Sequence, residues 1–75
     1  MTDRWPTLTD KQLIKILLRA GCVIKRQSGS HAFVYHPIKD RQATVALHGR
    51  DIRRGMLAQI IAQLGFTDDE FRALL

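Results

Sequence analysis

With 75 residues, the chain has room for one small domain, which we expect to span residues 1–75, and such a domain buries only about 60% of the surface of its unfolded chain. Most of its apolar residues are therefore needed for a core, which argues against a large closed substrate cavity and favours a shallow surface site. Twelve Lys and Arg against seven Asp and Glu give a net charge of +5, which favours a polyanionic partner: nucleic acid, an anionic membrane or an acidic protein.

We expect residues 1–6 to be a loose lead-in, from which Trp5 can pack on the body of the domain. No apolar stretch follows it within reach of a cleavage site, so we do not expect a signal peptide. No apolar run approaches the roughly 18 residues that a membrane span needs. Cys22 is the only cysteine, which excludes an internal disulfide. We therefore expect a cytoplasmic protein without a membrane partner.

Residues 9–20 are predicted to form the first helix. Thr9 and Gln12 fit a capping box at its start, and Gly21 suits the position after its end. Leu13 and Leu17 lie on one apolar arc of this helix. The opposite face carries Lys11, Lys15 and Arg19, a stripe that could contact phosphates or simply be solvated.

Three strands are predicted next, at residues 22–26, 31–36 and 42–48. They are joined by turns at residues 27–30 and 37–41, and Pro37 limits the second strand. Consecutive strands with short links form an antiparallel meander. Cys22 lies beside apolar residues and is expected to be a small core residue.

A second helix is predicted at residues 53–64, ended by Gly65, and a short third one at residues 68–75 behind a capping box of Thr67 and Glu70. This order predicts a two-layer α+β domain, α-β-β-β-α with a short extra C-terminal helix, like a double-stranded-RNA-binding domain. The expected core consists of Leu13, Leu17, Val23, Val45, Leu57, Ile60, Ile61 and Leu64.

His31 is the main candidate for chemistry. It follows Ser28, Gly29 and Ser30, small residues that let a polymer backbone approach and leave N–H groups free for a phosphate. Histidine exchanges protons near neutral pH, so an imidazole here could take the proton from a ribose 2′-OH during metal-free attack on RNA. Neighbouring cations would stabilise the charge on the phosphorane, and the candidates are Lys25, Arg26 and Arg41. A structural or merely exposed His31 is the alternative.

The other two histidines are weaker candidates. Simple hairpin register places His31 near Leu47 or His48, so His48 could supply the matching acid. His36 lies five residues from His31 on the same strand and hence on the opposite face, and we expect it at the surface of the strand end. A zinc site from this set is not expected, nor any other cofactor. Phe33 and Tyr35 alternate with His31, and we expect them to pack in the core, although Tyr35 could stack on a base.

Several short segments together resemble the HicA toxins. Their order and spacing agree over most of the chain, from about Leu13 to Phe71. The segments are Leu13-Ile14-Lys15-Ile16-Leu17 with Ala20-Gly21, Arg26-Gln27-Ser28-Gly29-Ser30-His31, His36-Pro37, Thr44-Val45, His48-Gly49, and Gly55-Met56-Leu57 through Ile60-Ile61 to Leu64-Gly65.

The resemblance implies a fold like that of double-stranded-RNA-binding domains, metal-independent cleavage of messenger RNA, and neutralisation by a HicB antitoxin in a hetero-oligomer. The essential histidine of the family follows Gly-Ser and corresponds to His31. Where the family frequently has Lys-Pro-Gly-Thr at the start of the second main helix, this chain has Arg53-Arg54-Gly55-Met56. This chain therefore lacks the proline and the threonine hydroxyl of the family pattern. Arg53 and Arg54 keep positive charge at a helix N-terminus, which already favours anions.

Two other functions fit the same residues. A non-catalytic RNA-binding module of this topology would not need His31, but a strong duplex binder usually carries a dense Lys cluster at its second helix, and this chain has only Arg53 and Arg54 there. A pure protein-interaction domain would use the charge of +5 to complement an acidic partner, and an acidic antitoxin would satisfy that interpretation and the toxin interpretation together.

Overall fold

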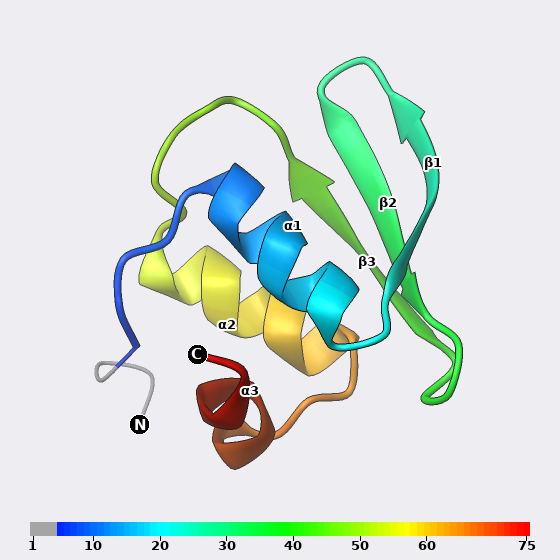
Figure 1. Cartoon of the computed structure of the whole chain (residues 1–75). Helices are drawn as coiled ribbons and strands as arrows, with labels where there is room; N and C mark the ends of the chain where they lie inside the picture. Colours follow the sequence, from blue (N-terminus) through cyan, green and yellow to red (C-terminus); the bar gives the residue numbers. More distant parts are fainter. Residues whose placement is uncertain (1–4) are drawn as a thin grey trace.

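The computed structural model describes residues 5–75, and the helices and strands in that part follow the predicted order (Figure 1). The elements are α1 (Asp10–Arg19), β1 (Val23–Ser28), β2 (His31–His36), β3 (Arg41–Ala46), α2 (Arg54–Gln63) and α3 (Asp68–Leu74). The α+β class is confirmed, with the α-β-β-β-α order of a double-stranded-RNA-binding domain and an extra helix. Residues 1–4 of the expected lead-in lie outside the described residues.

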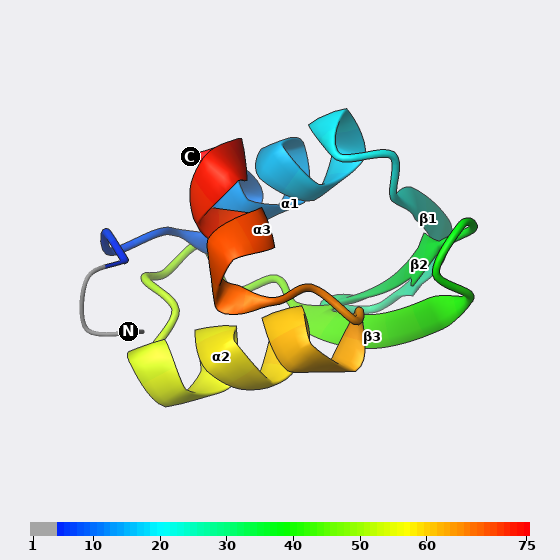
Figure 2. The ribbon, with the colours of Figure 1, turned by 90° about the horizontal axis from the view of Figure 1, so that it is seen from below.

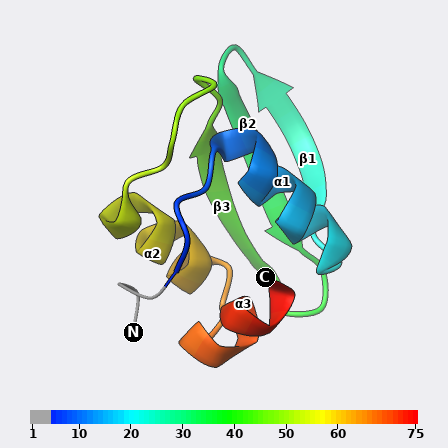
Figure 3. The same ribbon diagram turned by 60° about the vertical axis from the view of Figure 1, so that its left-hand side comes forward.

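The strands form an antiparallel sheet in the order β1-β2-β3. Phe33 in the middle of β2 lies between Arg26 of β1 and Thr44 of β3, and a bulge interrupts β1 between Ile24 and Arg26. Figures 2 and 3 show α1 and α3 packed together on one side and α2 running beside β3. The apolar residues between helices and sheet form the core.

The predicted core is confirmed at every position except Val23, which is 44% exposed. Cys22, one residue earlier, is buried in its place. Successive residues of a strand point to opposite faces, so burial of Cys22 turns Val23 outward. The whole of β1 is exposed because it is the sheet edge farther from α2. Val23 as a core residue was therefore wrong.

Trp5 is buried, as its expected packing on the domain requires. Its ring meets the ring of Phe71 edge to face, with centroids 4.8 Å apart. Aromatic pairs prefer such arrangements, and each ring buries a large apolar area. This contact joins the segment before α1 to α3, so both ends of the described chain are attached to one core.

His36 was expected at the surface, and this was wrong, because it is 5% exposed. Alternation along β2 turns His36 toward the helices together with Ala32 and Val34. Its Nδ1 accepts a hydrogen bond from the backbone N–H of Lys39, and its ring meets that of Phe66 edge to face. His36 is therefore a structural residue that holds the turn after β2.

β1 and β3 each begin one residue and end two residues away from the predicted boundaries. β1 extends to Ser28, because a loop of only Gly29 and Ser30 connects it to β2. Gly29 has a φ of 58°, and a positive φ at the first of two loop residues fits a type II′ turn, which matches the twist of the flanking strands. β3 ends at Ala46, so Leu47 and His48 lie in the connection to α2.

Candidate active site

His31 is the first residue of β2 and is exposed, on the rim of the β1–β2 hairpin. Its partners across the sheet are Ser28 on β1 and Ala46 on β3. Ser28 and Ala46 are small, so bulky neighbours do not crowd the imidazole from either adjoining strand. Ser30 ties the hairpin loop to the end of β3, because its carbonyl accepts a hydrogen bond from the N–H of Leu47.

His31 and His48 line one groove, of about 440 Å³, between the end of β3 and the start of α2. The register expected for them was wrong, because Ala46 is the residue opposite His31. His48 nevertheless borders the same groove, since the chain bends after β3. The lining residues are Asp10, His31, Thr44, Val45, Ala46, His48, Arg50, Asp51, Ile52, Arg53, Met56 and Ile60.

Asp10 holds the bend that carries His48. Its Oδ2 accepts the backbone N–H of His48 at 2.6 Å and that of Gly49 at 2.7 Å. Burial alone would raise the pKa of Asp10, but hydrogen bonds from backbone N–H groups, those of Gly49 and His48 first, outweigh it and lower that pKa. The buried carboxylate therefore stays ionised and continues to accept the backbone N–H groups of His48 and Gly49.

Backbone bonds add to this attachment on either side of Asp10. The N–H of Asp10 donates to the carbonyl of Arg50, and the N–H of Ile52 donates to the carbonyl of Leu8 at 2.7 Å. An isolated bridge also pairs Thr9 with Asp51. The segment before α2 is thus fixed along the start of α1, which makes this side of the groove rigid.

Positive charge reaches the groove from the chain just before α2. Arg50 and Arg53 line it, and Asp51 is the exposed carboxylate among them. Arg53 is the N-cap residue of α2 and makes no side-chain capping bond within the described residues, so the first N–H groups of α2 remain available to an anion. Arg54, in the first turn, is exposed and adds charge at the same helix end.

The expectation that Lys25, Arg26 and Arg41 adjoin His31 was wrong, because none of them lines its groove. Arg41 is paired with His36, at the other end of β2 from His31. Lys25 and Arg26 lie on the open face of the sheet. The Lys25 ammonium lies 4.8 Å from the ring centre of Tyr35, and the Arg26 guanidinium lies 5.2 Å from that of Phe33. Phe33 and Tyr35 share the face of His31, so the expectation that they pack in the core was wrong. Alternation sends Ala32 and Val34 to the core instead.

Tyr35 is also held through its hydroxyl, which donates to Asp40 at 2.7 Å. This hydrogen bond is the main cause that raises the pKa of Tyr35, and burial and the charge of Asp40 act in the same direction. Asp40 has a φ of 53° in the turn between β2 and β3. The open face thus ends in a turn whose shape is stabilised by one of its aromatic residues.

The comparison with protein families identifies this arrangement. A model described as the HicA toxin of bacterial toxin-antitoxin matches residues 11–66. The chain belongs to the HicA toxin family. It is thus the toxin of a toxin–antitoxin system, with an antitoxin as its partner. The search of curated proteins found no match.

The HicA match contains His31, His48 and the start of α2, but it begins one residue after Asp10. Asp10, Arg50, Thr44 and Met56 were missed as groove residues by sequence reasoning. Asp10 could have been noticed only as an acidic residue in a first helical turn, because its partners are 38 and 39 residues away. Thr44 comes close to His31 through the pairing of β2 with β3. Arg50 and Met56 reach the groove only when α2 and the segment before it fold against β3.

Two features are absent from residues 5–75, namely a metal-ligand cluster and a membrane-spanning helix. Among them, His, Cys, Asp and Glu side chains do not form a group of three or more that could hold a metal ion. In the same part of the chain, no helix is both long and apolar enough to cross a membrane.

Proposed function

We propose that this HicA toxin is a metal-independent endoribonuclease that cleaves messenger RNA with His31 as general base. The observation that supports this most is the common groove of His31 and His48, bordered by Arg50 and Arg53. An exposed imidazole beside small residues and cations suits attack on a ribose-phosphate chain. The protein is expected to act in the cytoplasm, where messenger RNA is available.

The reaction uses the ribose 2′-OH as nucleophile. His31 takes the 2′ proton, the 2′ oxygen forms a bond to the adjacent phosphorus, and the bond from phosphorus to the 5′ oxygen breaks. The products are a 2′,3′-cyclic phosphate and a 5′-OH end. Arg50 and Arg53 stabilise the additional negative charge on the phosphorane. Ser28, Gly29 and Ser30 allow the RNA backbone to approach His31 closely.

The leaving 5′ oxygen needs a proton, and His48 is the group that we assign to supply it. Support comes from its place in the His31 groove and from the two hydrogen bonds by which Asp10 fixes its backbone. One imidazole accepts a proton and the other donates one, so the pair is restored by exchange with water. His48→Gln should lower kcat while RNA affinity stays close to that of the wild type.

The proposal is tested with purified protein and RNA in the presence of excess chelator. We expect cleavage to continue, with 2′,3′-cyclic phosphate ends on the upstream fragments, because a 2′-OH nucleophile needs no metal-bound water. Loss of cleavage in chelator, restored by a divalent ion, would contradict the mechanism. RNA binding without any cleavage would instead favour the non-catalytic RNA-binding module.

We further propose that a HicB-type antitoxin forms a hetero-oligomer with this chain and neutralises it by covering the His31 groove. The net charge of +5 suits an acidic or mixed partner surface. Association should be slower at high salt, because opposite charges then steer the encounter less. A purified inactive complex in which His31 remains open to solvent would exclude inhibition by occlusion.

A further inference from the structure

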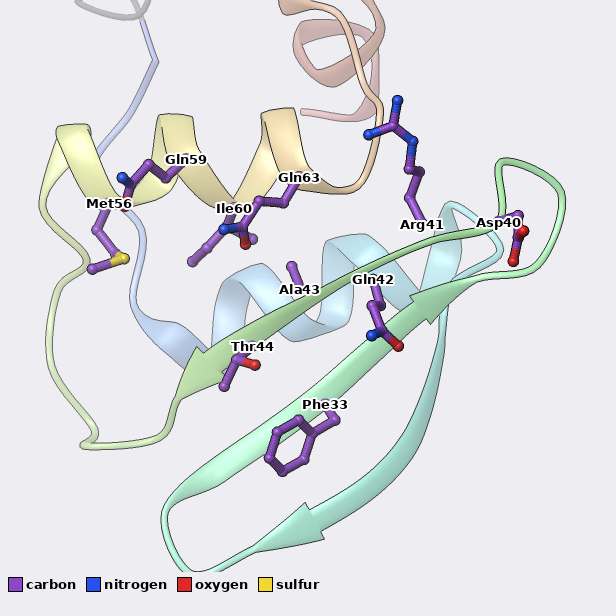
Figure 4. Close-up of a pocket in the computed structure, with 10 residues that line it drawn as sticks. All are labelled: Phe33, Asp40, Arg41, Gln42, Ala43, Thr44, Met56, Gln59, Ile60 and Gln63. Atoms are coloured by element: carbon purple, nitrogen blue, oxygen red, sulfur yellow. The ribbon is translucent and has the colours of Figure 1, made fainter.

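A second hollow, of about 690 Å³, adjoins the His31 groove (Figure 4). The two share Thr44, Met56 and Ile60, so they form one continuous trough along β3 and α2. The lining of this second hollow consists of Phe33, Asp40, Arg41, Gln42, Ala43, Thr44, Met56, Gln59, Ile60 and Gln63.

Amide side chains face this hollow from both of its walls. Gln42 comes from β3, whereas Gln59 and Gln63 come from consecutive turns of α2 (Figure 4). Each amide carries both a donor and an acceptor, as the edge of a nucleobase does. Among residues 5–75 these three amides have no hydrogen-bond partner, so their donors and acceptors are open to a ligand.

Phe33 supplies an aromatic ring on the sheet side of the hollow. It lies on the same face as His31, two residues along β2, which corresponds to roughly 7 Å of extended chain. The guanidinium carbon of Arg26 lies 5.2 Å from the ring centre and brings a positive charge beside it. An aromatic ring next to a cation is a typical platform for an unpaired base and the phosphate attached to it.

We propose that the Phe33 hollow binds a nucleobase of single-stranded RNA next to the bond that His31 cleaves, and so determines the cleavage sequence. This inference rests on the proposed function and adds that the RNA substrate is single-stranded and recognised through one of its bases. A base stacked on Phe33 meets the amides of Gln42, Gln59 and Gln63 at its edge. Duplex RNA does not fit, because its bases are already stacked and paired.

The charged residues at the far end agree with a polymer that continues through the hollow. Arg41 is exposed and lines this end of the hollow, so its charge is available to a neighbouring phosphate. Asp40, the carboxylate at this end, already accepts the hydroxyl of Tyr35. Positive charge from Arg41 at one end and from Arg53 at the other thus brackets the trough.

The test measures the affinity of short 2′-O-methyl RNAs that differ in one base, because the methyl group removes the nucleophile and binding is then separate from cleavage. Phe33→Leu should lower affinity about tenfold, the loss expected for one stacked base. Gln59→Ala with Gln63→Ala should change which base is preferred, and sequencing of cleavage ends should show the same change. Gln27→Ala is the matched control, since Gln27 is an exposed amide of β1 paired with Ala32 on the other face.

Unchanged affinity and base preference in both the Phe33 and the glutamine variants would overturn the inference, even if the wild type cleaves RNA. If those variants weaken antitoxin binding and leave RNA binding unchanged, the hollow is a docking site for the partner protein, which also overturns it. Base-selective binding that depends on Phe33 would support the inference even if the protein cuts no RNA, in which case only the proposed cleavage fails.

Discussion

The carboxylate of Asp10 accepts the backbone N–H of His48 at 2.6 Å, across 38 residues of sequence. A buried, ionised residue in the first turn of α1 thereby fixes the bend that brings His48 into the groove of His31. Catalytic groups must be held closely by a rigid surrounding, and here the support comes from outside the hairpin that carries His31. Asp10 is a positioning residue in this account.

Asp10 should contribute to stability at neutral pH and lose that contribution in acid. Its pKa lies below the ordinary value of 3.8, so on acidification the unfolded chain takes up the proton first. The stabilisation is complete above that ordinary value and disappears as pH falls through the folded-state pKa. The free energy of unfolding, measured in urea from pH 7 to pH 3, should show this decline. In Asp10→Asn the decline should be smaller.

Glu70 should account for part of the pH dependence of unfolding free energy that remains in Asp10→Asn. Its pKa is lowered by the backbone N–H of Thr67 first and by Lys39 second, so its stabilisation declines in the same direction. Asp51→Asn is the control for Asp10, since Asp51 borders the same groove but is exposed. An Asp10→Asn protein whose free energy of unfolding falls with pH as steeply as that of the wild type would refute the stabilisation assigned to the ionised carboxylate.

Cys22 should react only when the domain opens. It is 3% exposed, and burial raises the pKa of its thiol above the ordinary 9.0, which leaves little reactive thiolate. We expect Ellman's reagent to react about a hundredfold or more slowly with the native protein than with the urea-unfolded chain. Equal rates in the two states would place Cys22 at the surface, and Cys22→Ser provides the blank.

Charge reversal at the start of α2 should weaken RNA binding without removing the base. In Arg53→Glu and Arg54→Glu, affinity should fall for all RNA sequences alike, and the slope of log affinity against log salt should decrease by about 1 for each lost phosphate contact. Fluorescence anisotropy at several salt concentrations measures both. Lys15→Glu makes the same charge change at an exposed position of α1. An equal loss there would mean that only net charge matters.

The caps at the start of α1 and α3 could be predicted because they are local. Both expected capping boxes, Thr9 with Gln12 and Thr67 with Glu70, are present in full. The apolar arcs of the helices were predictable for the same reason, since 3.6-residue periodicity is independent of the rest of the fold. The positions of α1, α2 and the hairpins therefore followed from the sequence to within about two residues.

The residues that were misplaced depend on distant parts of the chain. Val23 was expected in the core and is exposed, whereas His36 was expected at the surface and is buried. Which residues of a strand are buried depends on where α1 ends and on which face of the sheet the helices cover. The exposed place of His31 was predictable from the small residues before it. The groove beside it was not, because Asp10 and α2 reach it from the two ends of the sequence.

The central claim is that His31 acts in chemistry and not in folding or RNA binding. The most direct measurement compares wild type and His31→Ala for cleavage rate, RNA affinity and urea stability in one set of preparations. Loss of a general base predicts a cleavage rate lower by about 10²–10⁴-fold. Affinity should stay nearly constant, because phosphate contacts come from Lys and Arg, and stability should change by about 1 kcal/mol or less, because His31 is exposed. A folded His31→Ala protein that cuts RNA at the wild-type rate would contradict the account.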